Sequence, residues 1–109
     1  MLNKNISKYN DYELVEASKN NPNNFTFLLN KYENKLKNYL FNISNIEKEE
    51  VEDLLQENFL KIYINLNDYD KDLKFSSWIY RIAHNHFIDY IRKKKKKLIF
   101  SIDNNEHFF

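Results

Sequence analysis

Glycine is absent from all 109 residues of this chain, and this absence constrains its fold more than any other feature. Glycine supplies the positive φ angles of tight hairpin turns and builds the loops that wrap around phosphate groups. A β-sandwich is therefore a poor fit, and a glycine-rich phosphate-binding loop is excluded. Because Pro22 is also the only proline, the composition indicates an all-α fold.

The length and the cysteine count further restrict the kinds of protein that this chain can be. A chain of 109 residues is the size of one domain, long enough to bury the core of a compact bundle of three to four helices. It contains no cysteine, which excludes a disulfide framework or a thiolate metal site and fits a cytoplasmic protein. No hydrophobic run approaches the length of a membrane span, so we expect no membrane partner.

Apolar residues that recur at spacings of three and four predict four helices. Asp11 is the expected N-cap of the first helix, and Pro22 ends it because proline disfavours helical geometry at the preceding residue. Residues 67–74, NDYDKDLK, show no helical period and are predicted to form a loop. The predicted helices cover residues 11–20, 23 or 24 to 44, 47–66 and 75 or 76 through Ile91 into the following lysines.

These elements predict a single folded domain at residues 11–97, preceded by an N-terminal extension at residues 1–10. Residues 98–109, LIFSIDNNEHFF, show no clear periodicity. We expect them to form an irregular, weakly ordered tail or the start of an interdomain linker.

The charges are divided between two parts of the chain. The formal net charge is only +1, yet the residues from Arg92 to Lys97 are six consecutive cations. Without these six, 11 of the 17 basic residues remain against 16 acidic ones, and the acids concentrate between Glu47 and Glu57. This division suggests two partners of opposite charge. A solvated helix followed by a solubilising tail explains it equally well.

A helical wheel of the last predicted helix separates two stripes, because successive residues lie 100° apart. The expected core face consists of Phe75, Ile79, Ile82, Ala83, His86, Phe87 and Tyr90. The second stripe consists of Trp78, Arg81, Asn85, Asp89 and Arg92. A tryptophan outside the apolar face most often packs against a neighbouring element.

The second stripe also contains the chemical groups that bind single-stranded nucleic acid. Trp78 offers a surface for base stacking, Arg81 a cation, and Asn85 a paired donor and acceptor for a base edge. We expect Tyr69 and Phe75 to add aromatic surface nearby. The basic run would contact backbone phosphates, and it consists of Arg92, Lys93, Lys94, Lys95, Lys96 and Lys97.

The third predicted helix presents an acidic face. Asp53 and Glu57 lie four residues apart, with Gln56 beside them, and like charges at this spacing repel by a few tenths of a kcal/mol. Pairing of Lys61 with Glu57 is expected to offset part of that cost. Such a face is either ordinary solvated surface or a docking surface for a basic partner.

No group of residues in the sequence indicates an enzyme or a cofactor site. His84 and His86 are two residues apart, so they lie on different sides of a helix and form a poor metal pair. No nucleophile elbow or paired catalytic carboxylates stand out. We therefore expect a protein that binds other macromolecules.

Two motifs occur in order, DLLQENF at residues 53–59 and WIYRIAHN at residues 78–85, the latter followed by Asp89, Arg92 and the lysines. Together they resemble region 2 of the sigma-70 family of bacterial RNA polymerase sigma factors, particularly the extracytoplasmic-function (ECF) group. The family pattern is acid–hydrophobic–x–Q–E/D–x–F, a loop, then W-[LI]-x-R-I-A-x-N-x-x-x-D-x-x-R and a basic run. Residues 11–36 resemble the opening helices, so the resemblance covers residues 11–97.

This resemblance implies a role for each motif. Asp53, Gln56 and Glu57 would dock on the β′ clamp helices of core RNA polymerase, and the loop with Tyr69 would capture a base flipped from the promoter −10 element. Trp78, Arg81 and Asn85 would hold the separated non-template strand. The implied function is a transcription initiation factor module that binds core polymerase and helps to recognise and melt the −10 element.

The chain departs from the family pattern in its loops and in its extent. Asn20 and Asn21 replace a common glycine, and asparagine tolerates the left-handed conformation that such a site can require. The loop before Phe75 also lacks glycine, which leaves its base preference open. The helix-turn-helix domain that reads the −35 element is missing. We interpret the chain as part of a longer factor, with a naturally shortened factor as the alternative.

Two other functions fit the same residues. The first is an interaction module whose main partner is an inhibitory anti-sigma protein. The second is a general basic DNA-binding domain, which would bind duplex DNA through Lys93 to Lys97 without polymerase.

Overall fold

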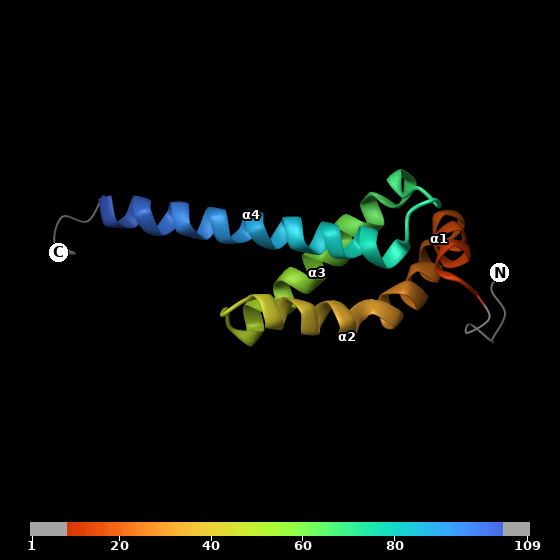
Figure 1. The fold of residues 1–109 in the computed structure, drawn as a ribbon, viewed down its shortest axis with the longest axis horizontal. Coiled ribbons are helices and arrows are strands. Elements are labelled where there is room, and N and C mark those ends of the chain that lie inside the picture. The colour runs from red at the N-terminus through yellow and green to blue at the C-terminus, as the bar shows by residue number, and fades with distance from the viewer. Residues whose placement is uncertain (1–8, 104–109) are drawn as a thin grey trace.

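Residues 9–103 are described in a computed structural model of the chain, and within them every regular element is a helix. This confirms the all-α prediction. In Figure 1 the last and longest helix crosses the bundle and extends past it. The elements are α1 (Asp11–Asn20), the 3-10 helix η2 (Pro22–Asn24), α2 (Phe25–Ile43), α3 (Lys48–Ile64), the 3-10 helix η3 (Leu66–Asp68) and α4 (Phe75–Asp103).

The start of α1 is fixed by a capping box, one residue before the predicted cap. The Asn10 side chain accepts a hydrogen bond from the Glu13 backbone N–H at 2.8 Å, and Glu13 accepts one from the Asn10 N–H at 3.1 Å. The prediction that Asp11 caps the helix is therefore wrong. Asp11 instead accepts hydrogen bonds from Lys31 and from the Tyr32 hydroxyl, and these contacts join α1 to α2.

The turn between α1 and α2 needs no left-handed residue. Asn21 is extended, with φ −145° and ψ 111°, and its side chain accepts a hydrogen bond from the Asn23 N–H. Across residues 9–103 no backbone φ angle is positive. Asn20 and Asn21 therefore do not adopt the left-handed conformation that asparagine tolerates.

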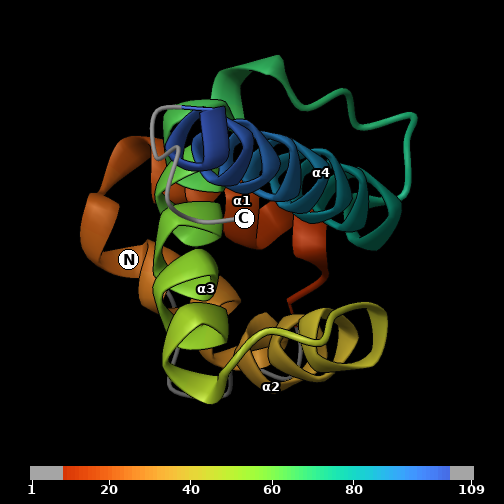
Figure 2. The ribbon, with the colours of Figure 1, turned by 90° about the vertical axis from the view of Figure 1, so that its left-hand side faces the viewer.

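The core forms where α3 packs against both α2 and α4, and Figure 2 shows α3 running from one to the other. The apolar positions of each helix meet there because they recur with the helical period. Within α4 the buried positions are Phe75, Ile79, Ala83 and Phe87, and all four belong to the predicted core face. The buried side chains of the other helices include Leu14, Val15, Leu28, Leu36, Leu40, Val51, Leu54 and Ile62.

The C-terminal part of α4 extends beyond the core (Figure 1). We expected an irregular tail from residue 98 onward, but the helix continues to Asp103, so this expectation is wrong for residues 98–103. Lysine and leucine are good helix formers, and no glycine or proline interrupts the segment. The rest of the predicted tail, residues 104–109, lies outside the described residues, as does most of the predicted N-terminal extension.

None of the described helices combines the length and the apolar character that a bilayer crossing requires.

Candidate functional site

The acidic residues of α3 lie on an exposed face of the bundle. Asp53, Gln56 and Glu57 are all exposed, whereas the buried residues of α3 point toward α2 and α4. Leu60 and Ile64 continue the same face at the next helical turns, with 59% and 65% of their surface exposed. We call these five residues the docking face.

Sequence reasoning missed Leu60 and Ile64. Both are apolar residues outside the buried stripe of α3, and more than half of the surface of each is exposed. Their displacement from the stripe was the signal that could have revealed them. An exposed apolar pair beside acidic groups is typical of a protein interface.

Gln56 also borders a hollow between α2 and α3. The hollow has a volume of about 200 Å³ and is lined by Gln56, Glu33 and three apolar side chains, Leu29, Leu55 and Phe59. Beside the docking face, it provides an apolar concavity into which a side chain of a partner could insert.

Glu57 contacts a histidine of α4. Its Oε2 atom lies 2.9 Å from Nε2 of His86, and Nδ1 of the same ring contacts Oδ1 of Asn58. The predicted pairing of Glu57 with Lys61 is therefore replaced by a contact between helices. Burial lowers the pKa of His86, and the nearby Glu57 carboxylate only partly opposes this shift.

The predicted single-strand-binding strip on α4 is exposed at Arg81 and Asn85. Trp78 is half-buried, and its ring packs against Tyr69 and Phe75 at centroid distances of 5.4 and 5.8 Å. Trp78 thus packs against a neighbouring loop while part of it remains accessible on the strip.

Tyr69 and Phe75 do not add exposed aromatic surface. They are 8% and 3% exposed, and the Tyr69 hydroxyl donates to the Leu73 carbonyl at 2.6 Å. Burial raises the pKa of the Tyr69 hydroxyl. The expectation that both rings add surface for a nucleic acid is wrong. Both rings are buried and pack against the ring of Trp78.

The basic run surrounds the protruding part of α4, since six consecutive helical residues point in all directions. Two of its members are engaged by carboxylates. Nζ of Lys94 lies 3.0 Å from Oε2 of Glu50 in α3, and Nη1 of Arg92 lies 3.4 Å from Oδ1 of Asp89. In the described part of the chain no ion pair involves Lys93, Lys95, Lys96 or Lys97, so these four are available to phosphates.

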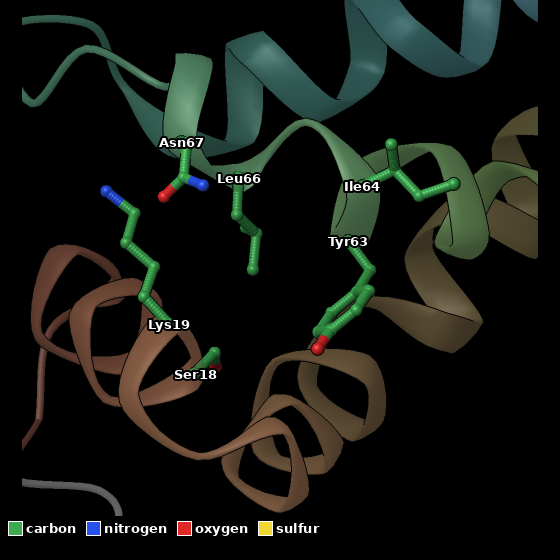
Figure 3. Close-up of a pocket in the computed structure, with 6 residues that line it drawn as sticks. All are labelled: Ser18, Lys19, Tyr63, Ile64, Leu66 and Asn67. Atoms are coloured by element: carbon green, nitrogen blue, oxygen red, sulfur yellow. The ribbon is translucent and has the colours of Figure 1, made fainter.

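The segment predicted to capture a base begins with a helical turn. Residues Leu66–Asp68 form η3, and the irregular part of the predicted loop is therefore shorter than residues 67–74. A pocket of about 220 Å³ lies between η3 and the end of α1. Figure 3 shows the Lys19 side chain extending toward Asn67, with Leu66 pointing into the space between the helices. The other lining residues are Ser18, Tyr63 and Ile64.

No cluster of acidic and histidine side chains suited to a metal ion occurs in residues 9–103.

A protein-family model described as Sigma-70 region 2 matches residues 28–97. The chain belongs to this family. Region 2 of a sigma factor is part of a transcription initiation factor and not of an enzyme, which agrees with the sequence-based interpretation.

Curated relatives place the chain near the ECF sigma factors. It is 40% identical over 72 residues to "ECF RNA polymerase sigma factor SigM" of Bacillus subtilis (strain 168), covering 66% of this chain and 43% of SigM. It is 37% identical over 83 residues to "ECF RNA polymerase sigma factor SigW" of the same bacterium, covering 75% of this chain and 43% of SigW. The chain therefore spans less than half the length of these relatives.

A solved structure shares the fold. An engineered region 2 of sigmaE, determined by NMR in complex with GTAAAA, aligns with a TM-score of 0.74 at 30% sequence identity. The alignment covers 89% of this chain and 98% of that chain. The helical arrangement is thus that of a sigma region 2 domain.

Proposed function

We propose that this chain binds core RNA polymerase and the promoter −10 element as the region 2 part of an ECF-type sigma factor. The main support is the solved relative, whose whole domain aligns with this chain and which was captured with GTAAAA. That sequence contains thymine, so the ligand of the relative is DNA. Such a factor acts where the polymerase acts, in the cytoplasm.

The docking face is the proposed polymerase contact. Asp53, Gln56 and Glu57 match the family motif for the β′ clamp helices, and all three side chains are accessible. Exposed Leu60 and Ile64 add apolar area that a partner can bury.

The strip of Trp78, Arg81 and Asn85 is the proposed contact for the separated non-template strand. Flipping a base out of the duplex costs a few kcal/mol of stacking, which an aromatic surface and a protein pocket can offset. Asn67 and Tyr69 belong to the segment proposed to capture that base, Asn67 at the pocket and Tyr69 as support for Trp78. The basic run adds affinity for backbone phosphates that weakens with salt.

Binding to DNA in the presence of polymerase tests this proposal. The probes are a GTAAAA-containing single strand and the same sequence as duplex, each measured with the chain bound to core polymerase. We expect Trp78→Ala and Asn85→Ala each to weaken single-strand binding more than duplex binding. An equal loss on both probes contradicts the strand-holding role and favours a general basic DNA-binding domain.

Polymerase docking is tested by the double variant Asp53→Lys, Gln56→Ala. We expect it to abolish binding to core polymerase while the circular dichroism spectrum stays helical. A matched control places the same kinds of change away from the docking face, as Glu16→Lys with Asn30→Ala. Both residues lie on other helices, where Asn30 is exposed and the Glu16 side chain is 42% exposed. Unchanged binding of the docking-face variant contradicts the assignment.

We also propose an inhibitory anti-sigma protein as a second partner of the docking face. The exposed pair Leu60 and Ile64 fits a partner that competes with polymerase for this surface. A pull-down with and without core polymerase separates the two: a competing partner is displaced when polymerase is added, and a partner of another surface is not.

A further inference from the structure

A polar contact joins α3 to α4 between the docking face and the core. Asn58 is completely buried, the His86 side chain is 11% exposed, and the Glu57 side chain is 62% exposed. The three groups therefore run from the interior of the bundle to its surface. His86 stands in the middle, with Nε2 toward Glu57 and Nδ1 toward Asn58.

The hydrogen positions follow from the chemistry of the partners. A carboxylate only accepts hydrogen bonds, so Nε2 of His86 carries the hydrogen and donates it to Glu57. Burial keeps the pKa of His86 low, which leaves Nδ1 as an acceptor at neutral pH.

A half-turn of the Asn58 amide then places its NH₂ group against Nδ1 of His86. Without this half-turn two acceptors, Nδ1 of His86 and Oδ1 of Asn58, would face each other. Asn58 thereby fixes the ring, and the ring fixes the carboxylate.

We propose that His86 is a positioning residue for polymerase docking, which it serves by holding the Glu57 carboxylate in a single orientation on the docking face. This inference rests on the function proposed above. An exposed glutamate loses rotamer freedom when a partner binds it, and a preformed contact reduces that loss. Asn58 and His86 occupy positions that the family pattern leaves unspecified.

A double-mutant cycle on full-length chain and core polymerase tests the inference. With Glu57 present, we expect His86→Leu to weaken polymerase binding by roughly threefold to tenfold, in the range of one hydrogen bond to an exposed charge. In the Glu57→Ala background the same change is expected to have little further effect, because the side chain to be held is gone. An equal loss in both backgrounds means that His86 is merely structural and overturns the proposal.

His86→Gln provides a second variant that keeps a side-chain N–H donor near the position of Nε2. We expect it to retain more polymerase binding than His86→Leu at a similar melting temperature. If His86→Leu does not fold, His86→Met, which also lacks a donor, replaces it in the cycle. Equal binding by two folded variants contradicts the positioning role, because only one of them can donate to Glu57.

A measurement without polymerase separates this inference from the proposed function. The pKa of His86, followed by NMR, should fall further in Glu57→Gln, because the carboxylate favours the protonated ring. The other charged groups near the ring, Lys61 and Asp89, remain as they are. An unchanged pKa overturns the contact itself. If the pKa shifts but the wild-type chain does not bind polymerase, the proposed function fails and the docking role of His86 fails with it.

Discussion

The Tyr90 hydroxyl donates a hydrogen bond to the Glu50 carboxylate and thereby ties the fourth helix to the first turn of the third. The same carboxylate holds Nζ of Lys94 at 3.0 Å, and that ammonium group also lies 5.8 Å from the centre of the Tyr90 ring. Lys94, one member of the basic run, is therefore held against the third helix.

Glu50→Gln should release Lys94 and strengthen binding to duplex DNA. We expect an increase of roughly twofold to fivefold at low salt, with a loss of stability below about 1 kcal/mol, because the pair is partly exposed. Fluorescence anisotropy with a labelled duplex measures the affinity. Glu49→Gln is the matched control, because Glu49 is an exposed neighbour and its substitution removes the same charge. Equal increases in both variants would show that net charge alone is responsible.

Tyr69→Ala should remove the support beneath Trp78. Truncating a buried aromatic side chain costs about 3 kcal/mol, which urea unfolding measures. Trp78 is the only tryptophan of the chain, so its emission reports directly on this packing. We expect a shift to longer wavelength and weaker single-strand binding.

Tyr69→Phe is the control for this change, because it keeps the ring and loses only the hydrogen bond to Leu73. It should leave the emission of Trp78 near that of the wild type. An unshifted emission in Tyr69→Ala would mean that Tyr69 does not support Trp78.

The four helices were predictable because each carries apolar residues at the helical spacing, and residues such as Ile79 and Phe87 are buried where that spacing places them. The continuation of α4 to Asp103 was not, because none of residues 98–103 is buried and no apolar stripe therefore marks this segment. Helix propensity decides there, and it gives a weaker signal than an apolar stripe.

At the site, the exposed residues of both motifs were placed correctly on their helices, but the contacts were not. Lys61 was the local candidate for Glu57, whereas the actual partner, His86, lies on another helix and is brought close only by the packing of α3 against α4. The burial of Tyr69 depends in the same way on the path of a loop that has no period.

Leu60→Ala should weaken polymerase binding by about tenfold, the effect of losing one well-buried leucine side chain at an interface. Its effect on stability should stay within about 0.5 kcal/mol, because Leu60 is 59% exposed in the free domain. Leu98→Ala is a close control, since Leu98 is also 59% exposed but lies on the protruding part of α4. Equal effects of the two substitutions on polymerase binding would remove Leu60 from the docking face.

The stability of the domain should decrease as the pH falls below about 6.5, the ordinary pKa of histidine. The folded state holds His86 at a lower pKa, so between that pKa and 6.5 the unfolded chain binds more protons and is favoured by acid. The slope cannot exceed about 1.4 kcal/mol per pH unit for one group. Urea unfolding at pH 7.5 and 5.5 measures it, and His86→Gln should flatten the dependence. If the stability of His86→Gln depends on pH as strongly as that of the wild type, groups other than His86 cause the dependence.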